Sequence, residues 1–234
     1  TRGIFKTTLQ PGTLKTTNTE TEITSGLLGN TSIQRQNIEN VTFTNSTPGE
    51  TVPLRAYYAN NNTGEDHTDT SSTKWENTAE TSMYEGTTVG TLNGGTWSND
   101  YLSLNGVNNW VNLGQMSFNS TVTLDVTITP KEIKSYEMAV LGNPEGGGVY
   151  LNINGGKPVF TVYIKELGSW VFAKSDKSVT VGEKIRLTGT YDGKNICLYV
   201  NGTLAAKTAQ TGTIGQPKNS TVMAIGCNPT GSSI

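Results

Sequence analysis

The stretch 184–227 constrains the fold more than any other part of the chain. An Asp192-Gly193 pair and an Asn201-Gly202 pair separate three short apolar segments, and a fourth segment, TVMAIGC, comes after a loop. Gly and Asn accept the positive φ angles that tight hairpin turns require, so such pairs are strong signals for hairpins. The stretch therefore predicts a three-stranded antiparallel meander followed by one more strand. A similar Asn-Gly-Gly-Lys turn at 154–157 predicts another hairpin.

Alternation of apolar and polar residues predicts further strands. It is clearest from Val122 to Ile128, where four aliphatic residues alternate with Thr, Asp and Thr. One face of this strand should therefore lie in the core and the other should face solvent. Burying them is worth roughly 6–12 kcal/mol, against the ~1 kcal/mol span of strand propensity, so burial should fix the register. The same alternation recurs at 149–153, 160–164, 185–187 and 196–200. We expect an all-β fold, a two-sheet antiparallel β-sandwich or jelly roll.

Composition limits the size and the partners. The chain has 234 residues, of which 33% are hydrophobic and 15% charged, and its net charge is −2. One sandwich with an extension fits that length. Nucleic-acid binding normally requires clustered Lys and Arg, so no nucleic-acid partner is expected. No apolar run is long enough to cross a bilayer, so we expect no membrane insertion of this chain.

The first 53 residues differ from the rest. They are rich in Thr and poor in large apolar side chains outside Ile38–Phe43, and Pro48-Gly49 and Pro53 mark the junction with the remainder of the chain. We expect 1–53 to be an N-terminal extension or stalk with one or two strands. The alternative is that it packs on the sandwich as extra edge structure.

The cysteines and the candidate catalytic residues do not indicate a redox, metal-binding or catalytic site. Cys197 and Cys227 permit one disulfide or two free thiols, and a bridge would require Cα atoms within about 7 Å. A single histidine, His67, disfavours zinc sites and nucleophilic triads. Retaining glycoside hydrolysis needs two nearby carboxyl groups, but the chain has no Glu-X-Asp-X-Glu: Asp125 stands alone, and Glu137 falls in a turn region. We do not expect an enzyme.

Five segments, taken in order, give the chain a resemblance to a known family. It resembles the laminin-G-like, concanavalin A-like lectin domains of bacterial surface proteins, over about three quarters of its length. The resemblance implies a two-sheet jelly roll over 54–234. The segments that carry it are LRAYYANNNTGEDHTDTSSTKW (54–75), TLNGGTW (91–97), YLSLNGVNNWVNLG (101–114), LTGTYDGKNICLYVNGTLAAK (187–207) and TVMAIGCNPTG (221–231).

One departure from the family concerns the closing strand. Relatives commonly continue after the AIGCNP stretch with a strand that closes the sandwich beside the first strand of the domain, whereas this chain stops at Ile234. An unpaired edge is a liability. We therefore expect the place beside Leu54 to Tyr58 to be filled by a segment of 1–53, by another chain, or by residues absent from this chain.

A second departure concerns calcium. Many relatives carry acidic residues in the loop NGVNNW (105–110), where this chain has neutral amides. Calcium prefers several oxygen ligands with enough negative charge to balance its own. Asp66 and Asp69, with Glu65 or Asp100 as further donors, are the remaining candidates. The alternative is a solvated acidic turn.

Aromatic residues on the polar phase of the strands indicate binding. Tyr150, Tyr163 and Tyr199 alternate with the aliphatic core residues, and Trp170 comes after a Gly-Ser corner. Flat aromatic faces suit the apolar face of a sugar ring, and nearby Asn, Asp and Lys could take its hydroxyls. The alternative is that each Tyr covers the sheet with its hydroxyl in water. The other tryptophans, Trp75, Trp97 and Trp110, are predicted to pack in the core or at its rim.

Together these features predict a noncatalytic surface adhesion module. We expect it to bind glycans in a lectin-like way and to belong to a bacterial adhesin, extracellular at the cell surface. The alternative is a structural or protein-binding module of a cell-surface filament or pilus, with a host surface protein as partner.

Overall fold

The computed structural model describes residues 14–16, 41–43, 73–76, 89–98, 101–218 and 221–229. The chain divides into two compact units, Thr1–Pro53 and Leu54–Ile234. In the first unit, β1 (Leu14–Thr16) pairs antiparallel with β2 (Val41–Phe43). Whether this unit serves as a stalk stays a prediction.

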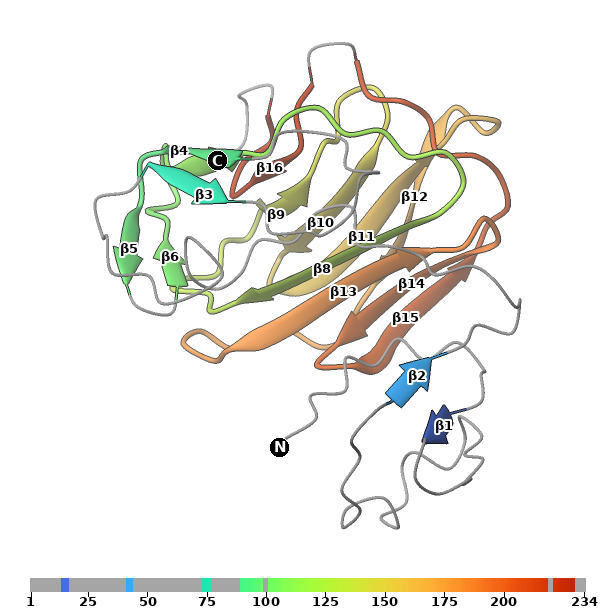
Figure 1. Cartoon of the computed structure of the whole chain (residues 1–234), viewed down its shortest axis with the longest axis horizontal. Coiled ribbons are helices and arrows are strands. Elements are labelled where there is room, and N and C mark those ends of the chain that lie inside the picture. Colours follow the sequence, from blue (N-terminus) through green and yellow to red (C-terminus); the bar gives the residue numbers. More distant parts are fainter. Residues whose placement is uncertain are drawn as a thin grey trace. The chain divides into compact units, whose positions relative to one another are not determined.

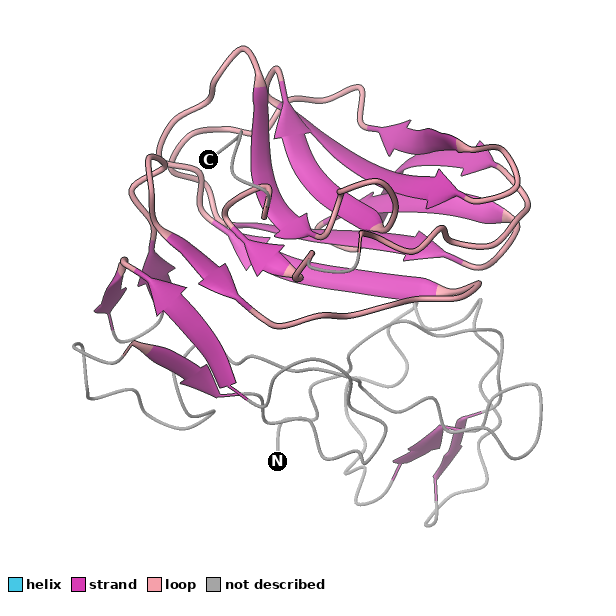
Figure 2. Ribbon diagram, turned by 90° about the horizontal axis from the view of Figure 1, so that it is seen from above, coloured by secondary structure: helices cyan, strands magenta, loops and turns pink. Residues whose placement is uncertain are grey.

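The second unit is a sandwich of two antiparallel sheets, which lie as two layers (Figures 1 and 2). The order of the eight-stranded sheet is β12 (Ser169–Lys174), β11 (Lys157–Ile164), β10 (Val149–Asn154), β9 (Glu137–Gly142), β16 (Ala224–Ile225), β7 (Trp110–Asn112), β4 (Val89–Asn93) and β3 (Lys74–Glu76). The order of the four-stranded sheet is β15 (Thr203–Ala209), β14 (Asn195–Val200), β13 (Ile185–Tyr191) and β8 (Val122–Ile128). A small hairpin joins β5 (Thr96–Ser98) to β6 (Tyr101–Ser103). The predicted all-β sandwich is confirmed.

The core lies between the two sheets. Leu187 and Leu198 reach it from the four-stranded sheet, and Leu151 and Phe160 reach it from the eight-stranded sheet. A Cβ on Gly189 would come within 2.3 Å of the Phe160 ring, so this glycine leaves the space that the ring fills. The predicted strand from Val122 to Ile128 is confirmed with the same bounds.

The predicted hairpin turns are confirmed as well. Asn201 and Gly202 have φ angles of 50° and 79°, and Gly155 and Gly156 have 59° and 81°. Two consecutive positive φ angles match the right-handed twist of the strands that such turns join. The strands β13, β14 and β15 therefore pair in sequence as the predicted meander.

Three expectations need correction. Of TVMAIGC only Ala224–Ile225 forms a strand, and this strand lies in the other sheet, between β9 and β7. Cys197 lies in β14 of the four-stranded sheet, whereas Cys227 follows β16 of the eight-stranded sheet. Both cysteines are free, so the disulfide alternative is wrong. Glu137 does not lie in a turn but begins β9.

Two other features concern edges and membranes. The edge beside Leu54 to Tyr58 lies outside the described residues, so the missing closing strand and its replacement stay a prediction. Among the residues that the structure describes, no helix has the length and apolar character to span a membrane.

Candidate functional site

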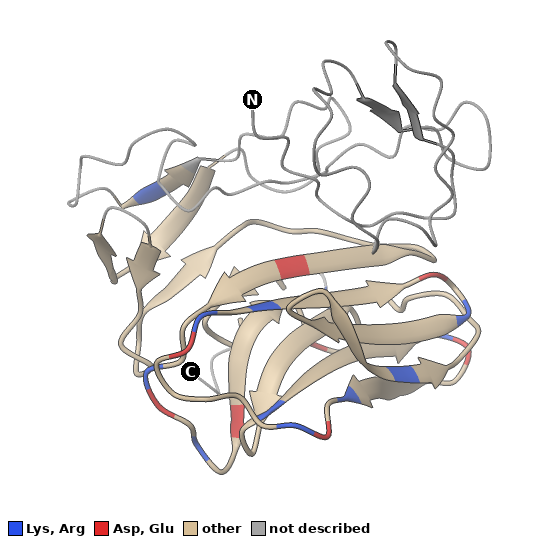
Figure 3. Cartoon of the chain, turned by 90° about the horizontal axis from the view of Figure 1, so that it is seen from below, with Lys and Arg blue, Asp and Glu red and all other residues tan. Residues whose placement is uncertain are grey.

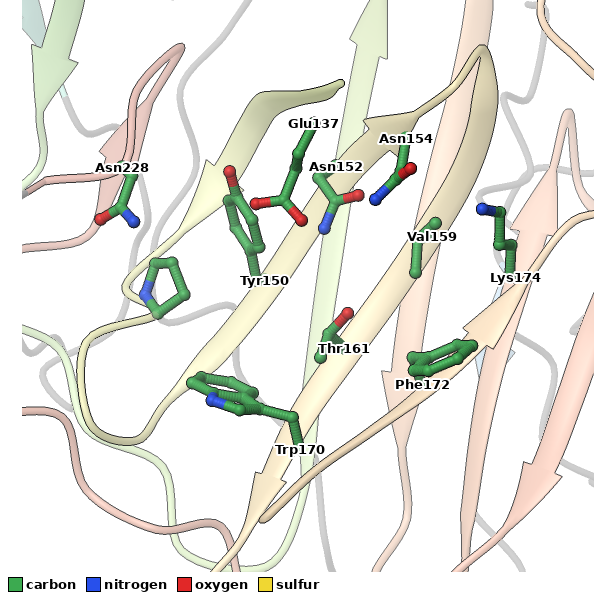
Figure 4. Close-up of a pocket in the computed structure, with 11 residues that line it drawn as sticks. Glu137, Tyr150, Asn152, Asn154, Val159, Thr161, Trp170, Phe172, Lys174 and Asn228 are labelled. Atoms are coloured by element: carbon green, nitrogen blue, oxygen red, sulfur yellow. The ribbon is translucent and has the colours of Figure 1, made fainter. Parts of the chain in front are cut away.

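A groove lies on the outer face of β9, β10, β11 and β12, opposite to the core (Figure 4). Its volume is about 360 Å³, within the range of small-molecule sites. Aromatic rings and polar side chains line it together. They are Glu137, Pro144, Tyr150, Asn152, Asn154, Val159, Thr161, Trp170, Phe172, Lys174 and Asn228.

Strand register brings these side chains side by side. Residues two apart on a strand share a face, so Tyr150, Asn152 and Asn154 of β10 point to the groove while their neighbours point to the core. Tyr150 pairs with Thr161 of β11, and Thr161 pairs in turn with Phe172 of β12. One row across the sheet therefore carries Tyr150 and Phe172 with Thr161 between them. The row on one side of it carries Asn152 and Lys174 with Val159 between them.

Two aromatic side chains of β12 form one wall. Trp170 is partly buried, and Phe172 is 54% exposed. The Trp170 ring meets the ring of Tyr163 edge to face, with centroids 5.1 Å apart. Tyr163 itself packs against Gly215, where an added Cβ would come within 2.4 Å of its ring. Tyr163 therefore positions Trp170 and does not line the groove.

Two buried polar atoms on the floor of the groove have no hydrogen-bond partner. Tyr150 is only 4% exposed and Asn152 only 2%, yet the Tyr150 Oη and the Asn152 Oδ1 are unpaired. Most buried polar groups in proteins are paired, because an unpaired one costs about 1–3 kcal/mol. Both atoms belong to side chains two residues apart on β10, so the unpaired groups lie on the same face of one strand.

The charge around these atoms keeps the tyrosine neutral. Burial raises the pKa of Tyr150 far above its ordinary value, and the nearby Glu137 carboxylate raises it further. Glu137 comes close to the Tyr150 hydroxyl without the geometry of a hydrogen bond. Figure 4 shows its carboxylate beside Tyr150 and Asn152, whereas Lys174 lies toward the other side of the groove. The Tyr150 hydroxyl is therefore available as a donor.

Gly142 of β9 makes room for the floor of the groove. It pairs with Tyr150 across the strands. A Cβ at this position would lie 2.4 Å from the carbonyl oxygen of Val149 and 2.8 Å from the Tyr150 ring. Backbone atoms cannot yield easily, so only glycine lets Tyr150 lie against β9.

The structure brings some of the predicted aromatic residues together. Tyr150 and Trp170 line the groove, and Tyr163 lies behind Trp170. Tyr199 belongs to β14 in the four-stranded sheet, away from this groove, and its role as a ligand contact stays a prediction. Trp97 is buried in the core and contacts Trp75 edge to face, as predicted for both.

Sequence reasoning missed Asn152, Glu137 and Phe172. Asn152 stands two residues after Tyr150, so it shares a face with it, and this spacing could have drawn attention to it. Phe172 stands two residues after Trp170 and gives the same signal. Glu137 had no such signal, because it comes from a separate strand.

The predicted calcium site lies elsewhere in the chain. Asp66 and Asp69 are outside the described residues, so calcium binding there stays a prediction. In the ranges that the structure describes, no three His, Cys, Asp or Glu side chains are grouped to hold a metal. The loop 105–110 is tied by its own amides, since Asn105 Oδ1 accepts hydrogen bonds from the backbone N–H groups of Val107, Asn108 and Asn109.

The described part of the groove lacks the pair of carboxyl groups that retaining glycoside hydrolysis uses. Retaining enzymes place two carboxyl groups about 5–5.5 Å apart. Glu137 is the only carboxylate among the described lining residues.

Figure 3 shows acidic and basic residues interspersed over the described part of the sandwich, without a large area of one sign.

Comparison with known proteins decides the family. Residues 98–233 match the family described as the concanavalin A-like lectin/glucanases superfamily. The chain belongs to this superfamily. No curated protein sequence matches the chain significantly.

Solved structures that match part of the chain come from several kinds of protein. Domain 4 of an extracellular arabinanase from Geobacillus stearothermophilus, in complex with arabinotriose, is 13% identical, with 73% of this chain and 72% of that chain covered and a TM-score of 0.43. The receptor binding domain of botulinum neurotoxin D is 14% identical, with 74% and 45% covered and a TM-score of 0.43. Domains LG4-5 of the mouse laminin α1 chain are 13% identical, with 62% and 42% covered and a TM-score of 0.38. In another structure of the serotype D binding domain, the match spans 35% of the toxin chain.

Proposed function

We propose that the second unit is a noncatalytic, lectin-like module that binds glycans in the groove of β9 to β12. The single observation that carries the proposal is the groove itself, where an aromatic wall faces two buried polar atoms without partners. A sugar ring has an apolar face for the wall and hydroxyl groups that both donate and accept. Membership in a superfamily of lectins and glucanases agrees with this ligand class.

The expected affinity of a single groove is weak. Covering about 100 Å² of sugar with one aromatic ring is worth roughly 2.5 kcal/mol. One or two hydrogen bonds add about 0.5–1.5 kcal/mol each. The total is close to the ~4 kcal/mol of a millimolar complex. Useful attachment would therefore depend on many copies at one surface, where avidity multiplies weak sites.

This weakness favours a role at a crowded surface. We propose that the module belongs to an extracellular adhesin of a bacterial cell surface, with the Thr-rich unit Thr1–Pro53 as its stalk. The alternative is a structural or protein-binding module of a filament or pilus, with a host surface protein as partner. The exposed side chains of Phe172 and Leu204 would be available to such a partner.

A glycan array tests the proposal with three proteins. The wild type should bind a reproducible set of glycans, and Trp170→Ala should weaken that binding roughly 60-fold, because about 2.5 kcal/mol is lost. Tyr199→Ala is the matched control, since Tyr199 lies in the other sheet. Silence across the array together with capture of a defined host surface protein would contradict glycan binding and support the alternative. Loss of binding in Tyr199→Ala alone would place the site on the other sheet.

A further inference from the structure

The floor of the groove holds three groups with different hydrogen-bonding needs. The Tyr150 hydroxyl is a buried donor with the Glu137 carboxylate beside it, and the Asn152 Oδ1 is a buried acceptor without a partner (Figure 4). No ion pair joins Glu137 to a Lys or Arg within the described ranges. These three groups form a small subsite that is polar, partly desolvated and negatively charged on one side.

We propose that Glu137, Tyr150 and Asn152 are the specificity-determining subsite of the groove, which takes neighbouring hydroxyl groups of an uncharged sugar ring and rejects a sugar that presents a carboxylate there. This inference rests on the proposed function, because it specifies the ligand of the same groove. It goes beyond that proposal by assigning the choice between neutral and acidic sugars to three residues.

Two sugar hydroxyls match the two unpaired atoms. One can accept a hydrogen bond from the Tyr150 Oη–H, and a second can donate one to the Asn152 Oδ1, so that each atom gains a partner. A neighbouring hydroxyl can then donate to Glu137, which makes a charge-assisted hydrogen bond. The pKa of Tyr150, raised by burial and by the carboxylate, keeps this donor protonated.

Access to the two atoms requires a side chain to turn. Both atoms are shielded from solvent in the free protein. Glu137 is partly exposed and lies beside them, so rotation of its side chain would uncover them. The ligand hydroxyl therefore takes the place of the Glu137 carboxylate beside the Tyr150 hydroxyl, and Glu137 becomes a contact of the ligand.

Charge explains the rejection of acidic sugars. A ligand carboxylate in this subsite would lie next to Glu137 in a partly desolvated place, where like charges repel strongly. Lys174 also lines the groove, but it is exposed and comes from β12 on the opposite side. It does not neutralise Glu137, with which it forms no ion pair.

Matched pairs of oligosaccharides test this inference. Binding of galacto-oligosaccharides and galacturono-oligosaccharides of the same linkage, and of gluco- and glucurono-oligosaccharides, is measured by titration calorimetry and by array competition. We expect the wild type to prefer the neutral member of a bound pair at least tenfold. Glu137→Gln should reduce that preference at least fivefold, with less than fivefold loss for the neutral sugar. Glu183→Gln is the matched control, since exposed Glu183 does not line the groove.

A second variant separates ligand binding from folding. Tyr150→Phe removes the unpaired hydroxyl and should weaken neutral sugar binding at least fivefold without lowering the melting temperature. Equal binding of neutral and acidic members, or a preference unchanged in Glu137→Gln, would overturn the inference while the glycan-binding function stands. Absence of binding to any glycan would overturn both, whereas a Tyr150→Phe protein that binds normally would remove Tyr150 from the subsite.

Discussion

The two outer faces of the sandwich are built by the same alternation, yet they satisfy their polar groups differently. On the four-stranded sheet, Asp125 accepts hydrogen bonds from Arg186 Nε at 2.9 and 3.0 Å and from the Thr188 hydroxyl at 2.7 Å. On the eight-stranded sheet, the Tyr150 Oη and the Asn152 Oδ1 are buried without partners. On the first face, no buried side-chain polar atom of the described residues lacks a partner, so we call this face complete. The second leaves hydrogen bonds open.

This difference indicates which outer face binds a ligand, although the two faces look alike in sequence. Exposed apolar side chains occur on both, since Phe172 and Leu204 are about equally exposed on the two sheets, and Tyr199 occupies the four-stranded one. Buried polar atoms without hydrogen-bond partners occur at the groove, together with Trp170, whose ring meets Tyr163 edge to face. Substitutions on the two faces should therefore have different effects on binding.

The largest effect is expected from Gly142→Ala. The new Cβ would meet the Val149 carbonyl oxygen at 2.4 Å and the Tyr150 ring at 2.8 Å, so β9 and β10 must separate. Overpacking of this kind costs about 3 kcal/mol. Denaturant unfolding should show that loss, and binding should disappear with it.

Gly202→Ala is the matched glycine change on the other sheet. Its Cβ meets nothing within 4 Å, and only the positive φ of 79° opposes it. We expect about 1 kcal/mol of destabilisation and unchanged binding. Equal costs for the two variants would show that Gly142 is not a close contact of Tyr150.

Asp125→Ala disturbs the complete face. The partners Arg186 and Thr188 lose their acceptor, but Arg186 is 41% exposed at its side chain and regains water. We expect a loss of about 1 kcal/mol in the free energy of unfolding. Glycan affinity should remain within twofold of the wild type. A strong loss of affinity with an intact fold would mean that the complete face also binds.

Tyr163→Leu tests the support of the aromatic wall. The edge-to-face contact with Trp170, at 5.1 Å between centroids, orients the indole ring. Such a contact is worth about 0.5–1.5 kcal/mol, so affinity should fall roughly twofold to tenfold. The loss should be smaller than that of Trp170→Ala, and a larger loss would mean that Tyr163 contacts the ligand directly.

The smallest effect on stability at neutral pH is expected from Tyr150→Phe. It deletes an unpaired buried hydroxyl, so the free energy of unfolding should stay within about 1 kcal/mol of the wild type at pH 7. The pKa of Tyr150 is raised by burial and by Glu137. The pKa of this tyrosine in the unfolded chain is about 10. Below that pH the stability that comes from keeping Tyr150 protonated should be fully present, and it should be lost as the pH rises further. Above that pH, the free energy of unfolding of Tyr150→Phe should fall by up to about 1.4 kcal/mol per pH unit less than that of the wild type. Identical alkaline slopes would contradict the burial of a protonated Tyr150.

Much of the fold could be predicted from local signals. Alternation gave the bounds of β8, and the Asn-Gly and Gly-Gly pairs predicted the turns whose positive φ angles the structure contains. The placement of β16 could not be predicted, because pairing between distant strands leaves no local mark. For the same reason the separation of Cys197 from Cys227 was not visible in the sequence.

The candidate site was predictable only in part. Alternation marked Tyr150, Tyr163 and Tyr199 alike as polar-phase aromatics, since it records the face of a strand but not the sheet to which the strand belongs. It also predicted that Asn152 faces solvent, whereas this residue is only 2% exposed. Glu137 reaches the groove through strand register, a nonlocal property.

A crystal structure with a bound neutral oligosaccharide would locate the ligand directly. We expect a sugar ring in the groove of β9 to β12, stacked on Trp170, with ligand hydroxyls within hydrogen-bonding distance of the Tyr150 Oη and the Asn152 Oδ1. A ligand bound on the four-stranded sheet or at the loops of the rim, with these two atoms still unpaired, would contradict it.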